Sequence, residues 1–377
     1  MLKLRSSPVP SLSILAAVVA VAGCTDTDID TRRDDGPVDP VAVAGLTSQL
    51  AQTLGVDEDD IVDLVAPAID PAELAAFRSF CSTQADLDET SRLADAPPLL
   101  ALPSTSSSST LPPDCDEAAR LATLVDDCGP LTPSTTQAAD RLDDALAGCV
   151  AGTTCHVVLP AGDFTGGADF GCAFIEGAGA ATRIHGVVSG AGILARVSVD
   201  DAYTPIQPYG ALLVNEAVVV GGYEGLSISW EADYDVAVCR SQIAGGYSGA
   251  GQSWASHKLV VAGSSVAACY EAVWSSWGSE QLLAQENILF AGHSGVSIHH
   301  SLASIVVGNA IASDNEAVGV SQWDQASLND LDGDGEPDAD GEDPYTPVIV
   351  GVLVRDNVVH DGTLPESDAA ADIIIDN

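Results

Sequence analysis

The chain has 377 residues, which is enough for two or three domains. Its 55 acidic side chains outnumber 13 lysines and arginines, so the formal net charge at pH 7 is −42. This charge repels nucleic acid and anionic lipid surfaces, and it would repel polyanionic sugars unless a cation intervened, so we expect no nucleic-acid partner.

The first 23 residues predict a secretory signal peptide. Lys3 and Arg5 precede an apolar run, SILAAVVAVAG, that is too short to span a bilayer comfortably. The run ends at Val21-Ala22-Gly23-Cys24, which resembles the lipobox of bacterial lipoproteins. That resemblance implies that Cys24 is acylated, that the chain meets a membrane through this anchor, and that it is an outer-membrane or cell-surface lipoprotein of the cell envelope. The alternative is an ordinary signal peptide followed by a chance cysteine.

Three segments of different composition follow. Residues 24–40 are polar and lack an apolar period, which indicates a flexible tether. Residues 41–95 predict a small helical region, because GLTSQLAQTLG has helical spacing and Asp70-Pro71-Ala72-Glu73 offers a cap and a first-turn proline. Residues 96–133 contain a Pro- and Ser-rich stretch and predict a linker that also carries cysteines.

The cysteines predict disulfides. Eight cysteines remain when Cys24 is set aside for lipid, which is an even number in a chain that we expect to be exported. Cys149 and Cys155 are close enough in sequence for a local loop, and so are Cys115 and Cys128. The sequence does not fix the pairing beyond these possibilities.

Residues 134–377 have a different pattern. A short amphipathic helical segment, STTQAADRLDDALAGC, is followed by V-x-L-P-A-G-x-F over residues 157–164 and by I-x-G-A-G-x-x-x-x-I over residues 175–184. This order resembles the start of right-handed parallel β-helix proteins of the pectate-lyase-like superfamily, in which the helix caps the first turn of the coil. The resemblance implies a mainly β fold, a right-handed parallel β-helix preceded by the small helical region.

A repeat of about 23 residues supports a solenoid. Segments of this length end in LSISW, AGQSW, VWSSW, VSIHH and VSQW, with short alternating apolar runs between glycines. In a parallel coil, equivalent positions of successive turns lie about 4.8 Å apart, so rings at one position stack. We expect two aromatic columns. One contains Trp230, Trp254, Trp277, His300 and Trp323; the other contains Tyr223, Tyr247, Tyr270 and His293, with Glu316 at the next equivalent position.

The tryptophan column has two possible roles. In GLSISW, strand alternation places Leu226, Ile228 and Trp230 on one face, which favours packing inside or at a corner of the coil. The alternative is an exposed platform for stacking sugar rings, with Trp230, Trp254, Trp277 and Trp323 as ligand-binding residues.

An acidic stretch, DLDGDGEPDADGED, lies within an insertion at residues 324–346 and predicts a calcium site. Its carboxylates have the alternating spacing that lets a loop wrap around one hard cation, and Gly335 permits the sharp turn. The stretch resembles the calcium loops of EF-hand, dockerin and thrombospondin type 3 repeats, except that Gly341 stands where an EF-hand has its bidentate glutamate. The alternative is a solvated acidic loop. The expected Ca²⁺ ligands are Asp330, Asp332, Asp334, Glu336 and Asp338.

Possible catalytic residues are few. His293, His299 and His300 fall within one predicted turn, and with Tyr270 and Lys258 they offer a base and an acid for proton abstraction beside a uronic carboxylate. However, His293 and His300 occupy the aromatic columns, where an imidazole simply replaces another ring. The weak catalytic candidates are therefore His299, Lys258 and Tyr270.

The sequence favours an exported, lipid-anchored scaffold that engages polysaccharide or another extracellular ligand, is braced by calcium, and is not catalytic. Two alternatives stay open. One is a carbohydrate-active enzyme of the polysaccharide lyase or epimerase type, and the other is a structural envelope or adhesion protein.

The calcium loop gives a first testable prediction. Replacing Asp332 and Asp334 together by asparagine should weaken Ca²⁺ binding by at least about tenfold, because each change removes a charged oxygen ligand. Isothermal titration calorimetry on the mature protein measures this, with a double variant at Asp57 and Asp59 as the control. Equal calcium affinity in both variants would show that the loop is not the site.

Overall fold

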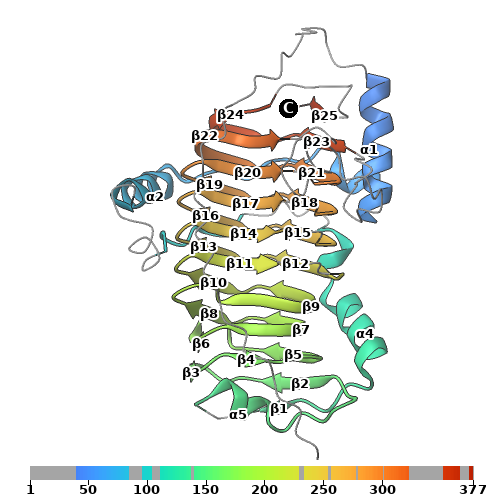
Figure 1. Ribbon diagram of the computed structural model, residues 1–377, viewed down its shortest axis with the longest axis vertical. Coiled ribbons are helices and arrows are strands. Elements are labelled where there is room, and N and C mark those ends of the chain that lie inside the picture. Colours follow the sequence, from blue (N-terminus) through green and yellow to red (C-terminus); the bar gives the residue numbers. More distant parts are fainter. Residues whose placement is uncertain are drawn as a thin grey trace, which may run out of the picture. The chain divides into compact units, whose positions relative to one another are not determined.

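The computed structural model describes residues 40–84, 96–103, 111–136, 140–228, 233–253, 256–276, 279–299, 301–321, 351–365 and 373–376. The predicted fold class is confirmed. Parallel strands form a solenoid of about eight turns with about 23 residues per turn. Each turn contributes one strand, called a rung, to each of three faces (Figure 1).

Strands that pair with each other in successive turns define the faces. Face A contains β2 (Cys155–Val158), β5 (Ala173–Glu176), β12 (Asp235–Cys239), β15 (Lys258–Ala262), β18 (Gln281–Gln285), β21 (Ala303–Val307), β23 (Gly351–Arg355) and β25 (Ile373–Asp376). Face B contains β3 (Gly162–Thr165), β6 (Thr182–His185), β8 (Ser198–Asp201), β10 (Val218–Gly221), β13 (Gln242–Gly245), β16 (Ser265–Ala268), β19 (Ile288–Ala291) and β24 (Val358–Thr363).

Face C contains β4 (Ala168–Asp169), β11 (Glu224–Ile228), β14 (Ser248–Gln252), β17 (Glu271–Ser276) and β20 (Ser294–His299). Long strands turn corners: β7 (Val188–Ala195) and β9 (Ile206–Asn215) pass from face C to face A, and β22 (Ala310–Ser321) passes from face B to face C. The two-residue β1 (Thr135–Thr136) pairs with β2, and α5 (Leu142–Leu146) buries Leu142 and Ala145 in the same core as the first rungs.

Apolar side chains in register fill the coil. Leu212, Val236, Leu259 and Leu282 pair in sequence across face A, and each is at most 1% exposed. Leu282 then pairs with Ser304. An unbroken count of 23 residues per turn predicts Ile305 at this position and is therefore wrong by one residue. The turn is one residue shorter here. Ile305 faces outward instead and is buried in the cluster that includes helix α1.

A ladder of buried amides holds the turn between faces A and B. Asn309 Nδ2 donates to Ala284 O and to Asn357 Oδ1, both at 2.9 Å. Asn309 Oδ1 in turn accepts from the backbone N and from Nδ2 of Asn287, also at 2.9 Å. Ser264 and Ser241 continue the ladder toward the N-terminal rungs. Each side chain satisfies backbone groups that the turn leaves unpaired inside the coil.

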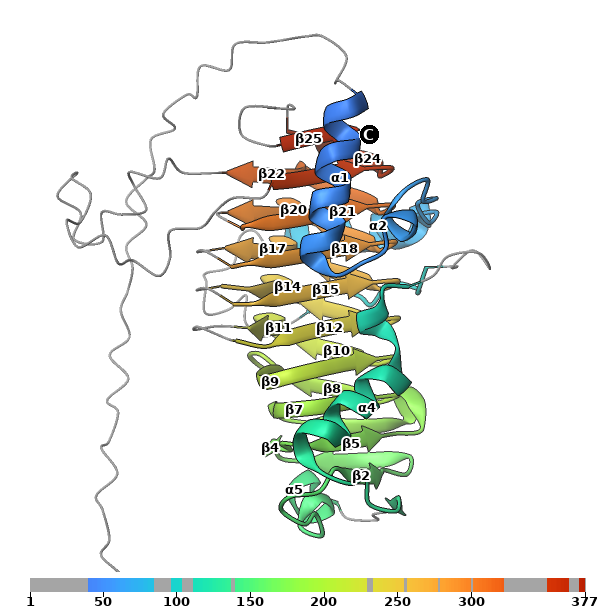
Figure 2. The same cartoon turned by 90° about the vertical axis from the view of Figure 1, so that its right-hand side faces the viewer.

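Helix α1 (Pro40–Leu54) covers the later rungs of face A (Figure 2). Its Val43, Leu46, Leu50 and Leu54 follow helical spacing and are buried in one cluster with Leu283, Val307 and Leu353 of the coil. Gly55, with φ +69°, ends the helix, and Val56 N donates to Ala51 O at 3.0 Å, as in a Schellman motif. The short η1 (Glu58–Ile61) follows.

Helix α2 (Pro71–Gln84) packs on face B. The predicted cap is confirmed, because Ala72 N donates to Asp70 Oδ1 at 2.8 Å. Phe77 is 1% exposed, and its ring lies 5.6 Å from that of Phe290 in β19. Leu100, within the predicted linker, belongs to the same cluster.

Helix α4 (Glu117–Cys128) follows η2 (Pro113–Cys115) and covers the earlier rungs of face A. Both carboxylate oxygens of Glu117 accept from Arg196, at 3.1 and 3.2 Å. Asn215 Nδ2 donates to the same carboxylate at 2.8 Å. Part of the segment for which a linker is predicted is therefore a helix docked on the coil.

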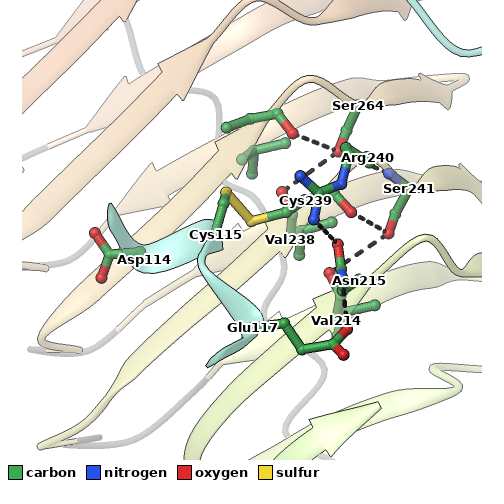
Figure 3. Close-up of a disulfide and its surroundings, with 12 residues drawn as sticks. Asp114, Cys115, Glu117, Val214, Asn215, Val238, Cys239, Arg240, Ser241 and Ser264 are labelled. Atoms are coloured by element: carbon green, nitrogen blue, oxygen red, sulfur yellow. Dashed lines mark hydrogen bonds between the residues drawn. A yellow bond between two sulfur atoms is a disulfide. The ribbon is translucent and has the colours of Figure 1, made fainter. Parts of the chain in front are cut away.

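The described residues form four disulfides, and three of them tie the N-terminal segment to the coil. These three are Cys81–Cys269, Cys115–Cys239 and Cys128–Cys172. Figure 3 shows Cys115–Cys239 next to the contact between Glu117 and Asn215. The local pair Cys149–Cys155 forms. The possible pair Cys115–Cys128 does not, because helix α4 holds these residues at opposite ends of a rod about 18 Å long.

The amide ladder predicts a large effect of one substitution. Asn309→Ala leaves the backbone N–H of Asn287 and the carbonyl of Ala284 without these partners, at roughly 1–3 kcal/mol for each buried group. We expect the free energy of unfolding, measured by urea titration, to fall by roughly 2–6 kcal/mol. The exposed Asn315→Ala serves as the control. A fall of the same small size in both variants would contradict this role for the ladder.

Candidate functional site

Face C differs from the other two faces. The described helices α1 and α4 lie on face A and α2 lies on face B, whereas no helix lies over β11, β14, β17 and β20 (Figure 1). Helix α5 contacts face C at β4, in the first turns. The outer side of face C from β11 to β22 therefore lies under no described α-helix, and the same holds for face B at β3, β6 and β8. On face C, Ser248, Ser294 and Ser297 are at most 2% exposed.

Glutamate and serine alternate in one column on this face. Glu224, Ser248, Glu271, Ser294 and Glu316 are successive partners across β11, β14, β17, β20 and β22. A carboxyl therefore recurs at every second rung, a backbone spacing of about 9.6 Å. This spacing is comparable to the length of two linked sugar rings.

A second column alternates small and large residues. It contains Ser227, Gly251, Trp274, Ser297 and Gly319 in register. A Cβ at Gly251 would lie 1.9 Å from Trp274 Cε2, and one at Gly319 would lie 2.1 Å from Glu316 Oε2. The glycines thus leave room for a ring and a carboxyl to lie flat on the face. Trp274 Nε1 is buried and has no hydrogen-bond partner among the described residues.

Two short hydrogen-bond chains connect the carboxyls to histidines. Ser297 bonds the carboxyl of Glu271, and its Oγ lies 2.6 Å from His299 Nε2. His299 Nε2 is itself 4.0 Å from Glu271 Oε1. The His299 side chain is 44% exposed and that of Glu271 is 15% exposed, so the imidazole links a shielded carboxyl to solvent.

The second chain runs from His293 to Glu316. Ser294 Oγ donates to Glu316 Oε2 at 3.2 Å and lies 2.9 Å from His293 Nδ1. Asn315 Nδ2 lies 3.1 Å from His293 Nε2. The amide nitrogen can only donate, so this network assigns the proton to Nδ1, which then donates to Ser294.

A stack of rings borders the face at the turn from face B. The predicted column is confirmed: Tyr223, Tyr247, Tyr270 and His293 stack, with centroids 4.6–5.1 Å apart. Tyr203 extends the stack by one rung. Glu316 does not continue it, because 22 residues separate His293 from Asn315, which takes the equivalent place. The rings cover one another, so the stack mainly braces the turn.

Burial shifts the pKa values of three groups on this face. Burial raises the pKa of Glu271, against the lowering effect of its hydrogen bond with Ser297, and the charges of Glu316 and Glu224 raise it further. Burial also raises the pKa of Glu224. Burial lowers the pKa of His299, while the charge of Glu316 acts in the opposite direction. The pKa of the Glu271 carboxyl and the pKa of the His299 imidazole, two groups joined through Ser297, therefore lie closer together than the ordinary values of such groups.

The catalytic candidates from sequence do not meet. Tyr270 lies in the turn directly before β17, whereas His299 is the last residue of β20, at the opposite end of the neighbouring rung. Lys258 lies on face A, where Nζ donates to Leu54 O at 2.6 Å and to Asp114 Oδ2 at 2.9 Å. Lys258 is 6% exposed and holds the N-terminal segment, so it cannot act with the other two.

Several predicted sites fall outside the described residues. They are the acylation site Cys24, the tryptophan column with His300, and the calcium ligands in the insertion at 324–346. Within the described part of the chain, no group of three or more His, Cys, Asp or Glu side chains could hold a metal ion. None of the helices described there is long and apolar enough to cross a membrane.

Sequence reasoning missed most of this face. The spacing does not point to Glu271, Ser297 or Trp274 as site residues, and it assigns Glu316 to the ring column. A signal was present, since the ring of each turn is followed directly by glutamate or serine, as in Tyr223-Glu224, Tyr247-Ser248 and Tyr270-Glu271. Because the ring position recurs once per turn, the residue directly after it must also recur once per turn and form a column of its own.

Comparisons of the chain with protein-family models, with curated proteins and with solved structures find no match. Membership of the pectate-lyase-like superfamily therefore stays a prediction. The parallel solenoid is shown, but a solenoid does not by itself identify a function.

Glu271 provides a pH-dependent test of this site. Because its pKa is raised in the folded protein above the ordinary value of 4.5, ionising it costs stability as pH rises through the folded pKa. Glu271→Gln should therefore raise the free energy of unfolding at pH 7, and the gain should vanish below about pH 4.5. Urea unfolding at pH 7 and pH 4 measures the difference.

Glu58→Gln, at an exposed position of η1 away from face C, is the matched control. A Glu271→Gln variant that is less stable than the wild type at pH 7 would contradict the assigned cost of ionisation.

Proposed function

We propose that the protein is an exported, lipid-anchored β-helix that binds an extended polysaccharide along face C. The observation that carries this proposal is the division of the coil surface. Helices cover face A and the later rungs of face B, while face C carries carboxyls and an indole in columns at the spacing of the rungs, with buried serines between them. A polymer with a regular repeat can make the same contact on several rungs, which raises its overall affinity.

The anchor and the metal belong to the same proposal. Lipid on Cys24 would hold the coil at the bacterial cell surface, and the tether at 24–40 would give it reach. Calcium bound by the acidic loop would brace the insertion after Trp323. Both rest on the sequence motifs, and the disulfides are consistent with an exported protein.

Charge restricts the ligand. The strand residues that the structure describes on face C include no lysine or arginine, and they include Glu224, Glu271 and Glu316. A polyuronate would meet only like charge at this surface. We therefore favour an uncharged glycan, and we do not favour a lyase or epimerase, which would need a cation next to the uronic carboxylate.

Binding to uncharged polysaccharides tests the proposal. Affinity electrophoresis in gels that contain barley β-glucan, xyloglucan, galactomannan or dextran, run with calcium, should retard the protein with at least one of them. Glu224→Ala and Trp274→Ala should each weaken that retardation by at least about fivefold, since face C supplies polar and ring contacts. His257→Ala, a half-exposed histidine near Asp235 and Glu280, is the control.

Two outcomes would contradict the proposal. One is that no uncharged glycan retards the protein. The other is that His257→Ala weakens binding as much as the changes on face C do.

A further inference from the structure

One buried ion pair joins the N-terminal segment to the coil. Lys258 Nζ donates to Asp114 Oδ2 at 2.9 Å and to Leu54 O at 2.6 Å. The side chain of Lys258 is 7% exposed, and that of Asp114 is 15% exposed. The pair therefore lies where β15, η2 and the end of α1 meet, and water has little access to it.

The surroundings of the pair are apolar. Leu54 and Cys115 in the N-terminal segment belong to one buried cluster with Ala237 and Val260 of face A. Val260 lies on the same side of β15 as Lys258, two residues further along, and Ala237 is its register partner. An apolar environment disfavours separated charges, so transfer of one proton from the ammonium to the carboxylate is easier here than in water.

Asp114 is held firmly against the lysine. It follows Pro113 in η2 and precedes Cys115, whose disulfide to Cys239 fixes this turn on face A (Figure 3). Lys258 is held in turn by its place in strand β15. Folding therefore brings an amine and a carboxyl into lasting contact, which is the condition under which intramolecular reactions become fast.

From this contact we infer that Lys258 and Asp114 become joined by a covalent amide, an isopeptide bond between Nζ and Cγ. The reaction needs no cofactor and no co-reactant. The ammonium first passes a proton to Oδ2, and the neutral amine then attacks Cγ. The bond from Cγ to Oδ2 breaks as a second proton passes from the nitrogen to Oδ2, which leaves as a water molecule.

The neighbouring groups suit both the product and the path to it. An amide nitrogen keeps one N–H, and Leu54 O is in place to accept from it. Burial lowers the pKa of Arg120, and the charges of Asp235 and Asp114 raise it, so the guanidinium interacts with the carboxyl that reacts. A cation at this place stabilises the negative oxygen of the tetrahedral intermediate.

The bond would give the chain a tie that reductants do not break. Three disulfides hold the N-terminal segment on the coil, and thiols can reduce each of them. An amide between residues 114 and 258 closes a loop of chain that survives reduction. The inference is independent of the proposed function, because it concerns neither face C nor a glycan.

Intact mass spectrometry of the full mature protein, after complete reduction of its disulfides, tests the inference. The wild-type chain should be lighter than its sequence requires by the mass of one water molecule. Lys258→Arg is the matched variant, because it keeps the positive charge but its guanidinium stays protonated and does not attack a carboxyl. This variant should have its full mass.

Peptide mapping of the same reduced protein gives a second readout. Lys258 is the only lysine after Lys3, so a chain with an amide at Nζ should be cut by trypsin only after arginines. The peptide 93–120 should then appear joined to the peptide 241–355. Asp114→Ala should release the two parts separately, whereas Asp126→Asn, at an exposed position of α4, should retain the joined peptide.

The contrary results are equally specific. Full mass in the wild type, with tryptic cleavage after Lys258, overturns the isopeptide bond and leaves an ordinary buried ion pair. A joined peptide whose branch maps to residues other than Lys258 and Asp114 also overturns it. Both decisive measurements use the wild-type chain, so a variant that fails to fold does not alter the outcome.

Discussion

The structure depends on one constraint, the parallel in-register pairing of each rung with the next. Pairing fixes the spacing at about 4.8 Å, so a residue type that recurs once per turn becomes a column. Inside the coil this produces the amide ladder of Asn287, Asn309 and Asn357. Outside it produces the tyrosine stack and the column of alternating glutamate and serine. The same pairing geometry thus stabilises the interior of the coil and produces a repeating pattern of side chains on its outer surface.

The N-terminal segment decides which surface is available. Its helices bury outward-facing residues of the coil such as Leu283 and Phe290, which would otherwise be exposed apolar area. Disulfides at Cys81, Cys115 and Cys128 hold it in place. Face A and the later rungs of face B are consequently structural, and the proposed recognition is assigned to face C. The described strands of that face carry no lysine or arginine, so the face is suited to uncharged partners.

Sequence spacing predicted the solenoid and the tyrosine column, because both follow from a period that is visible without coordinates. The same counting failed at Ile305 and Glu316, since one shorter turn moves every later residue by one place. The site was harder to predict. Spacing assigns a residue to a rung, but whether a helix covers it depends on distant segments, as the burial of Lys258 under Leu54 and Asp114 shows. The bond of Ser294 to Glu316 depends on side-chain direction, which a period does not contain.

A crystal structure of the protein with a short uncharged oligosaccharide tests the central claim most directly. The account predicts sugar rings along face C over β17, β20 and β22. It also predicts Glu271, Ser294 and Glu316 in one column on consecutive rungs. Sugar bound on face A or face B, or coordinates in which these three residues do not align, would contradict it.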